Sequence, residues 1–262
     1  MTTNQSGKSV HCFKKNAEIT DEIKEKVEKI VAFWDGQVGP FGSSSRLSLN
    51  WEKDINDWTI FNESGCIIFS YFPNQSLNTS GQSQNLVDLG FKLYNIELEL
   101  EEIGISTCIS TSFNDEKATS YIKKLKIHLM EFEVPVVLYF GFEDKNANIF
   151  KKFISWFYSD SYRLPLSSIV IEKTDLNKYI DLFEAFRHSP SSGNSQTWRV
   201  IQNQSIVHFY TTSELGERYI NIGCAVAAFC NAAKQKSIKG HLFVSASYPK
   251  NCYEYIISWE FQ

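Results

Sequence analysis

The sequence predicts an α+β protein in which amphipathic helices and short strands share one core. Three observations lead to this prediction. Apolar residues recur at helical spacing in several stretches, and elsewhere they alternate or run together over the short segments typical of strands. A similar order of elements occurs twice along the 262-residue chain, and hydrophobic residues make up 43% of it, enough for a sizeable core.

Composition and charge limit the classes of partner. The net charge is −4 at pH 7, and no basic cluster offers a surface for nucleic acid or an anionic membrane. No segment approaches the roughly 20 consecutive apolar residues that span a bilayer, and the first residues lack an apolar signal core. We therefore expect a soluble cytoplasmic protein that binds neither nucleic acid nor membrane.

The six cysteines and five histidines do not indicate a metal site. They form no CxxC pair and no spacing suited to zinc. The chain also lacks a GxxxxGK[ST] phosphate loop, an HExxH helix, a GxSxG nucleophile elbow and a tight GxGxxG turn. We expect reduced, mostly buried thiols, no bound metal and no catalytic side chain of these kinds.

Helix and strand patterns succeed one another along the first half of the chain. Thr20 suits the N-cap of a first helix, and a long apolar stripe that begins at Leu86 marks the clearest helix. The predicted elements are a helix from Thr20 to near Gly36, a turn over 36–45, strands over 46–53 and 65–72, a polar loop over 73–84, a helix over 86–103 stopped by Gly104, a polar loop over 105–115, a helix over 116–131 and a buried strand over 134–142.

The second half repeats much of this order. After a helix over 175–188 come a polar turn, strands over 198–203 and 206–212, a helix over 221–235, and strands over 241–247 and 252–261. The segments "GPFGSSSRLSLN" and "SPSSGNSQTWRVIQN" correspond, as do Asp88-Leu89-Gly90 and Asn221-Ile222-Gly223. The pattern predicts one domain over 1–262 built from half-units near 1–150 and 165–262, related by a pseudo-two-fold axis. Alternatively, Asn221-Ile222-Gly223 is only a helix N-cap.

The turn that begins at Ser189 concentrates small polar groups in front of a strand. Pro190 fixes its entry, the Ser and Asn side chains supply hydroxyls and an amide, and Gly193 allows backbone N–H groups to approach a ligand. Such groups suit a flat heterocycle or a phosphate. The same composition is also typical of a turn that only joins a helix to a strand.

Four ordered motifs resemble those of the FMN-dependent nitroreductase superfamily. "SPSSGNSQTWRV" resembles the turn "APSxxNxQPWxF", with Thr197 in place of the family's proline. "KSVHCF" resembles "RRSxRxF", "LEEIGISTCISTSFN" resembles "A..LGLGTCWLGGFN", and "YRLPLSSIV" resembles "kRLPLxEiv". Together they span almost the whole chain.

The position of the turn narrows this resemblance. In ordinary nitroreductases the turn follows soon after the N-terminal motif, and two chains form the site. In this chain the N-terminal motif and the turn lie far apart, and a degenerate "GPFGSSSRLSL" occupies the early position. The sequence thus resembles the tandem-repeat subgroup called putative TM nitroreductases, in which one chain imitates the dimer. The resemblance implies a nitroreductase-like α+β fold with antiparallel and mixed sheets flanked by helices, and a monomeric protein.

The resemblance also implies a set of FMN-binding residues. The phosphate would lie among Lys8, Ser9, His11 and Arg163, and Ser110, Thr111 and Ser112 would line the isoalloxazine edge through their backbone. Pro190, Ser191, Ser192 and Asn194 would close over the flavin from the opposite half. Other interpretations stay open: Lys8 and His11 as solvated surface groups, Arg163 as the partner of an acid, Trp198 as a core residue and Cys108 as an inert buried thiol.

By the same resemblance, NAD(P)H would deliver hydride to flavin N5, leave, and be replaced by a nitroaromatic, quinone or similar acceptor. This ping-pong chemistry is carried by the flavin and requires no catalytic side chain. The alternative is a degenerate flavin-binding protein without efficient turnover, favoured by Gly7 and His11 in place of arginines, by Thr197, and by "CISTSF" in place of "CWLGGF". A third interpretation, a purely structural or interaction module, would require the four motif matches to be coincidental.

Overall fold

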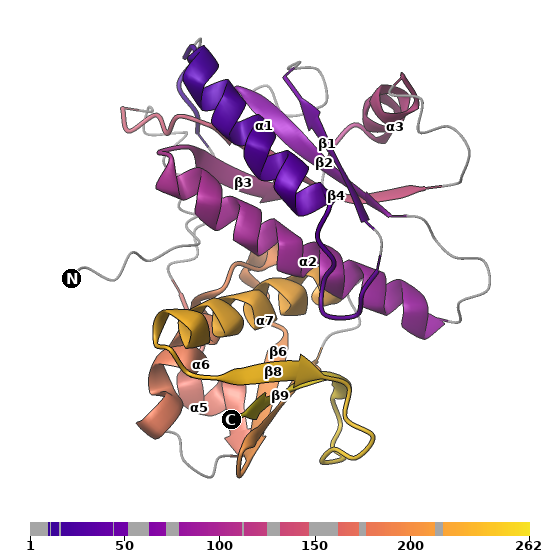
Figure 1. Cartoon of the computed structure of the whole chain (residues 1–262), viewed down its shortest axis with the longest axis vertical. Coiled ribbons are helices and arrows are strands. Elements are labelled where there is room, and N and C mark those ends of the chain that lie inside the picture. Colours follow the sequence, from indigo (N-terminus) through magenta and orange to yellow (C-terminus); the bar gives the residue numbers. More distant parts are fainter. Residues whose placement is uncertain are drawn as a thin grey trace.

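The protein is built of two β-sheets separated by a pair of crossing helices (Figure 1). The computed structural model describes residues 10, 12–15, 17–43, 45–51, 63–71, 79–111, 113–124, 132–146, 162–172, 177–212 and 217–262. Of the predicted flavin-site residues, Lys8, Ser9, His11 and Ser112 lie outside these described residues. The α+β class predicted from the sequence is confirmed.

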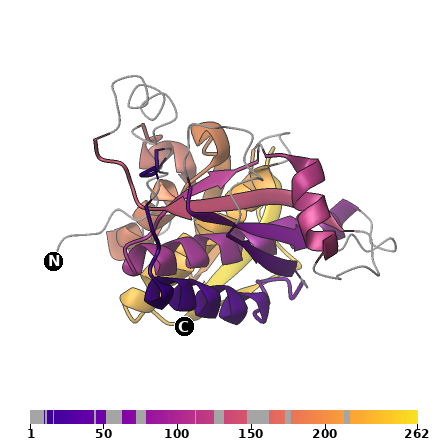
Figure 2. The ribbon, with the colours of Figure 1, turned by 90° about the horizontal axis from the view of Figure 1, so that it is seen from above.

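The first sheet is antiparallel throughout and has the strand order β1-β2-β4-β3. Its strands are β1 (Ser45–Asn50), β2 (Gly65–Tyr71), β3 (Ser106–Ser110) and β4 (Glu133–Gly141), and its helices are α1 (Asp21–Asp35), α2 (Thr79–Glu102) and α3 (Asp115–Lys124). Alternate residues of β2 and β4 pack against α1 and α2 on one face and against α3 on the other. Figure 2 shows these helices on opposite sides of the sheet.

The second sheet is mixed, because β5 and β6 are parallel while the other pairs are antiparallel. Its strand order is β5-β6-β7-β9-β8. The elements of this half are α5 (Leu166–Ile169), β5 (Val170–Glu172), η1 (Asn177–Tyr179), α6 (Ile180–His188), η2 (Ser192–Asn194), β6 (Trp198–Asn203), β7 (Ile206–Thr211), α7 (Arg218–Gln235), β8 (Gly240–Phe243) and β9 (Glu254–Phe261).

Helices α2 and α7 cross with their backbones in contact. A Cβ atom on Gly90 would lie 2.1 Å from the carbonyl oxygen of Ile220, and one on Gly223 would lie 2.2 Å from that of Val87. Both glycines are therefore required for this separation of the helices, which any larger residue would increase.

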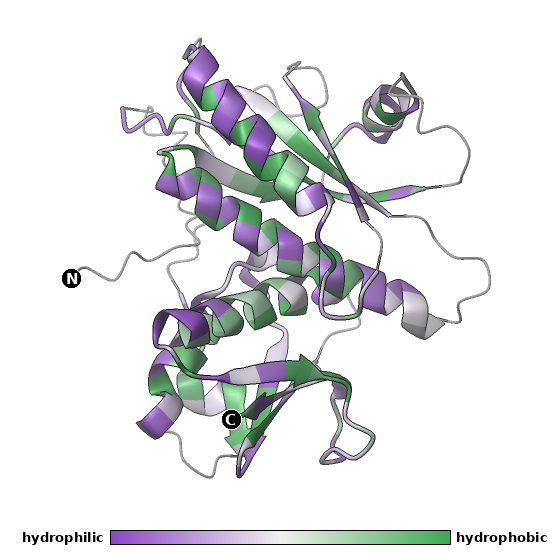
Figure 3. Ribbon diagram, in the orientation of Figure 1, coloured by the Kyte–Doolittle hydropathy of each residue, from purple (hydrophilic) through white to green (hydrophobic). Residues whose placement is uncertain are grey.

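Helix α7 contributes to the cores of both halves. A helix between two apolar layers must be hydrophobic around most of its circumference. In Figure 3, α7 carries mainly hydrophobic colours up to its C-terminal turns. Helix α1, by contrast, alternates hydrophobic with hydrophilic residues. The residues that join the first core are Ile220, Cys224, Ala227 and Ala228, and those that join the second are Ile222, Ala225, Val226, Phe229 and Ala233. Helix α7 thus packs into the hydrophobic cores of both halves.

Several sequence predictions of local structure are confirmed. Thr20 caps α1 by accepting a hydrogen bond from the backbone N–H of Ile23 at 3.4 Å, and Gly36 follows the last helical residue. Strands β2 and β4 lie within one residue of their predicted ranges, and β6 matches its prediction. Among the described residues, no helix is long and apolar enough to cross a membrane.

Other local predictions are wrong. Residues 106–110 form strand β3 rather than a polar loop, because pairing with β4 satisfies their backbone while Thr107 and Cys108 are buried. Helix α2 begins at Thr79, inside the predicted loop over 73–84. Asn221 is not an N-cap but the fourth residue of α7. Helix α5 and strand β5 were not predicted, since both are too short to show a period.

We predict that Gly223→Ala destabilises the protein by about 1–3 kcal/mol or more, because the added methyl group would force α2 and α7 apart. Gly36→Ala is the matched control. Gly36 already has a right-handed conformation, and the nearest atom to its Cβ position lies at 3.6 Å, so no loss of stability is expected. Urea unfolding midpoints of both variants test the prediction, and an unchanged midpoint for Gly223→Ala would contradict it.

Candidate functional site

The polar turn before β6 is a compact, strained structure. Gly193, Asn194 and Gln196 have φ angles of 57°, 53° and 46°, in the left-handed region that residues other than glycine adopt at a cost. Hydrogen bonds hold it closed, from Asn194 N–H to the Ser191 carbonyl at 3.0 Å and from Gln196 N–H to Ser191 Oγ at 3.1 Å. Apart from its two chain neighbours, no atom of the described residues lies within 4 Å of a Cβ position on Gly193, and the residue is exposed.

Helix α7 anchors this turn through Asn221. The Oδ1 atom of Asn221 accepts a hydrogen bond from Ser192 N–H at 3.1 Å, and its Nδ2 atom donates to Ser195 Oγ at 3.3 Å. Asn221 lies two residues before Gly223, so the helix crossing and the turn are positioned by the same turn of α7.

Arg163 lies against the turn. Its guanidinium donates to Asn194 Oδ1 at 2.8 Å and to the carbonyl oxygen of His188 at 3.0 Å. Asn194 in turn donates from Nδ2 to the Tyr162 carbonyl at 2.8 Å. Two of the predicted flavin-site residues, Arg163 and Asn194, are thus in direct contact, although 31 positions separate them in sequence.

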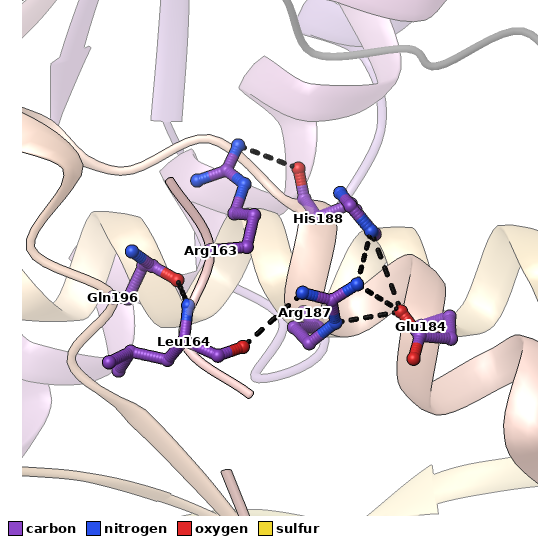
Figure 4. A network of polar contacts seen from close by, with 6 residues as sticks. All are labelled: Arg163, Leu164, Glu184, Arg187, His188 and Gln196. Atoms are coloured by element: carbon purple, nitrogen blue, oxygen red, sulfur yellow. Dashed lines mark hydrogen bonds and ion pairs between the residues drawn. The ribbon is translucent and has the colours of Figure 1, made fainter. Parts of the chain in front are cut away.

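The carboxylate of Glu184, near Arg163, forms an ion pair with Arg187 (Figure 4). Glu184 Oε2 accepts from Arg187 at 2.6 and 2.7 Å, and the His188 ring lies 2.7 Å from the Arg187 guanidinium. Burial, and then the cations Arg187 and Arg163, lower the pKa of His188. Glu184 is thus paired with Arg187, while the Arg163 guanidinium donates to the neutral oxygens of Asn194 and His188.

A second group of predicted residues lies on the first sheet. Ser110 ends strand β3 and is half-buried, and the exposed Thr111 follows it directly. The N-terminal segment runs beside this strand, because Val10 N–H donates to the Thr107 carbonyl at 2.8 Å and Phe13 pairs with Glu143. The structure therefore places Val10 of the "KSVHCF" motif beside β3, while Pro190 to Asn194 belong to the other half.

The first half contains a turn that corresponds to the one at Ser189. Asp88 of α2 accepts hydrogen bonds from Phe41 N–H at 2.9 Å, Ser43 N–H at 2.8 Å and Ser43 Oγ at 2.7 Å. Asp88 lies two residues before Gly90, as Asn221 lies before Gly223. Burial raises the pKa of Asp88, and these hydrogen bonds and Lys92 oppose that rise.

Sequence reasoning did not assign roles to Gln196, Asn221, Arg187 or Asp88. A signal existed for three of them, because Gln196 belongs to the turn motif while Asp88 and Asn221 mark the repeat. Trp198 is fully buried in the second core against Phe186, which agrees with its interpretation as a core residue. Cys108 is buried, as expected.

Comparison with solved structures identifies the class of fold. The chain superposes on a putative nitroreductase from Thermotoga maritima with a TM-score of 0.60 and 15% sequence identity, covering 98% of this chain and 90% of that chain. Further similar structures are a putative nitroreductase in complex with FMN from Desulfovibrio desulfuricans (TM-score 0.46, 11% identity, 65% of this chain and 94% of that chain) and a putative NAD(P)H:FMN oxidoreductase from Staphylococcus epidermidis (0.45, 14%, 63% and 91%). The fold is that of the nitroreductases.

The family follows from the sequence match. The family model described as "Putative TM nitroreductase" matches residues 48–233, more than half of the chain. The chain therefore belongs to this family and is an oxidoreductase of the nitroreductase type. The search of curated proteins gave no match. The resemblance stated from the four motifs is confirmed at the level of the family.

Thr197, which stands where the family motif has proline, carries a buried hydroxyl group. No group in the described part of the chain hydrogen-bonds to this hydroxyl. Thr197→Val replaces this unsatisfied hydroxyl with a methyl group and should stabilise the protein by about 1 kcal/mol. In the control variant Thr107→Val, a buried hydroxyl that donates to Glu97 at 2.7 Å is lost, so stability should fall by about 1–3 kcal/mol. Thermal unfolding measures both, and destabilisation by Thr197→Val would contradict the first expectation.

Proposed function

We propose that the protein binds one FMN between its two halves and uses NAD(P)H to reduce nitroaromatic, quinone or similar acceptors. The observation that carries this proposal is the contact between Arg163 and Asn194. Two segments meet there, and a separate family motif predicts flavin ligands in each of them. The exposed Gly193 lies in the same turn.

The residues present fit the chemistry of the group. An FMN phosphate requires cationic and neutral hydrogen-bond donors, and the isoalloxazine requires backbone donors together with a flat, closely approachable surface. Arg163 supplies the charge, while Ser191 and Ser192 supply hydroxyls. Gly193 supplies exposed backbone without a side chain.

In this proposal the bound flavin supplies the redox chemistry, accepting hydride from NAD(P)H and passing electrons to the acceptor. The protein binds and orients it. Lys8, Ser9, His11 and Arg163 hold the phosphate, the backbone of Ser110, Thr111 and Ser112 lines the flavin edge, and Pro190, Ser191, Ser192 and Asn194 close over it from the second half. Because the donor and the acceptor bind in turn at one flavin, no side chain needs to act as acid, base or nucleophile.

We further infer that the chain is a tandem repeat that acts as a monomeric pseudo-dimer within a single domain over 1–262, with half-units near 1–150 and 165–262. The strand orders support this inference, since β1-β2-β4-β3 corresponds element by element to β6-β7-β9-β8. The helices support it too, because α2 follows β2 and α7 follows the corresponding strand β7, and the two helices cross at Gly90 and Gly223. Asp88 and Asn221 also occupy matching positions. Each lies two residues before the glycine of the helix crossing and accepts a hydrogen bond from the turn of its own half.

The difference between these matching turns supports a single flavin per chain. Asp88 turns a carboxylate toward the backbone N–H groups of the first turn and occupies two of them. A phosphate brought to that turn would meet negative charge and lose those donors. The neutral Asn221 accepts from only one N–H of the second turn, so this turn carries no such repulsion.

The proposal predicts that the purified protein, supplied with FMN, acquires a bound-flavin visible spectrum that NAD(P)H bleaches in the absence of air. Failure to take up FMN would contradict the proposal. Uptake without bleaching would favour the alternative, a flavin-binding protein of this fold without efficient turnover, for which the substitution at Thr197 is the supporting observation.

We also predict that Arg163→Ala and Lys8→Ala each weaken FMN binding by about 10- to 150-fold, since each removes a charge-assisted contact worth about 1.5–3 kcal/mol. Arg46→Ala and Lys14→Ala are matched controls that remove a cation elsewhere, from β1 and from a site just after the N-terminal motif. Fluorescence titration with FMN measures all four. Unchanged affinity in both test variants would show that the phosphate lies elsewhere.

A further inference from the structure

The side chain of Gln196 connects the turn to the segment that carries Arg163. Only 3% of Gln196 is exposed. Its Oε1 atom accepts a hydrogen bond from Leu164 N–H at 2.7 Å (Figure 4), and its Nε2 atom donates to the Tyr162 carbonyl at 3.2 Å. The same amide also donates to the Asn194 carbonyl at 3.3 Å.

These bonds bracket Arg163 on both sides. One amide group pairs with a carbonyl at residue 162 and an N–H at residue 164, much as a neighbouring strand pairs with alternate groups of an extended chain. Arg187 adds a bond from its guanidinium to the Leu164 carbonyl at 3.3 Å. These bonds hold the backbone at Arg163 in place, which limits the rotamers open to its side chain.

The backbone of Gln196 shows that this arrangement carries a cost. Its φ of 46° lies in the left-handed region, which a long side chain seldom occupies, and burying an amide costs free energy unless its donors and acceptor are satisfied. The amide of Gln196 satisfies its donor and acceptor groups through Leu164 and Tyr162, which lie 32 and 34 positions earlier in the sequence. A simple tie between helix and strand would not need an amide aimed at both neighbours of an arginine.

We propose that Gln196 is a positioning residue, which fixes the guanidinium of Arg163 where it binds the phosphate of FMN. This inference rests on the proposed function, because it assumes that Arg163 contacts the phosphate. It assigns to Gln196 no contact with the flavin itself. Loss of Gln196 should therefore weaken the binding of a flavin that carries a phosphate. It should leave the binding of a flavin without a phosphate nearly unchanged.

The test compares FMN with riboflavin, which lacks the phosphate. Gln196→Met keeps the length of the side chain and removes all three of its hydrogen bonds. We expect about tenfold or greater weakening of FMN binding with riboflavin affinity nearly unchanged. In the double variant with Arg163→Ala, the FMN affinity should equal that of Arg163→Ala alone, since the glutamine acts through the arginine.

A second variant covers the case in which Gln196→Met does not fold. Gln196→Asn keeps a buried amide, but the shorter side chain cannot reach both Leu164 and Tyr162, so the same selective loss is expected. Equal weakening of both flavins, additive effects in the double variant, or unchanged FMN affinity would each overturn the inference. If Arg163→Ala itself fails to separate FMN from riboflavin, the proposed phosphate site is wrong and the inference falls with it. If Arg163→Ala weakens the binding of FMN more than that of riboflavin and neither Gln196 variant does so, only the inference about Gln196 fails.

Discussion

The contact between Gly90 of α2 and Gly223 of α7 is the constraint on which the rest of the structure depends. Because neither residue has a side chain, the helix backbones meet directly, and α7 can contribute side chains to the cores on both of its sides. The residues two positions earlier, Asp88 and Asn221, are then fixed within reach of the turn in their own halves. One packing contact thereby sets the relation between the sheets and the position of both turns.

The two halves use this common framework differently. In the first half, a buried carboxylate closes the turn around its own backbone donors. In the second half, the turn is held by an amide, keeps the backbone of Gly193 open, and adjoins Arg163. The two turns thus differ in the side chain that holds them, a carboxylate in the first half and a neutral amide in the second.

Local sequence patterns predicted much of the fold, because capping, periodicity and uniform burial are properties of short segments. Thr20 and Gly36 delimit α1, and the apolar residues of β2 leave little alternative to a buried strand. Strand β3 was missed because its polar residues are stabilised by pairing with β4, which local pattern does not reveal. Family motifs assigned the turn and Arg163 to the flavin site, and this assignment stays a prediction. The role proposed for Gln196 depends on partners more than 30 positions away that only the folded chain brings together.

The central claim is that one flavin lies between the halves with its phosphate at Arg163. A crystal structure of the protein grown with FMN tests this most directly. The account predicts one flavin per chain, its phosphate within hydrogen-bonding distance of the Arg163 guanidinium and the turn from Pro190 to Asn194 against it. A flavin bound away from Arg163, or a second flavin at the turn that Asp88 closes, would contradict the account.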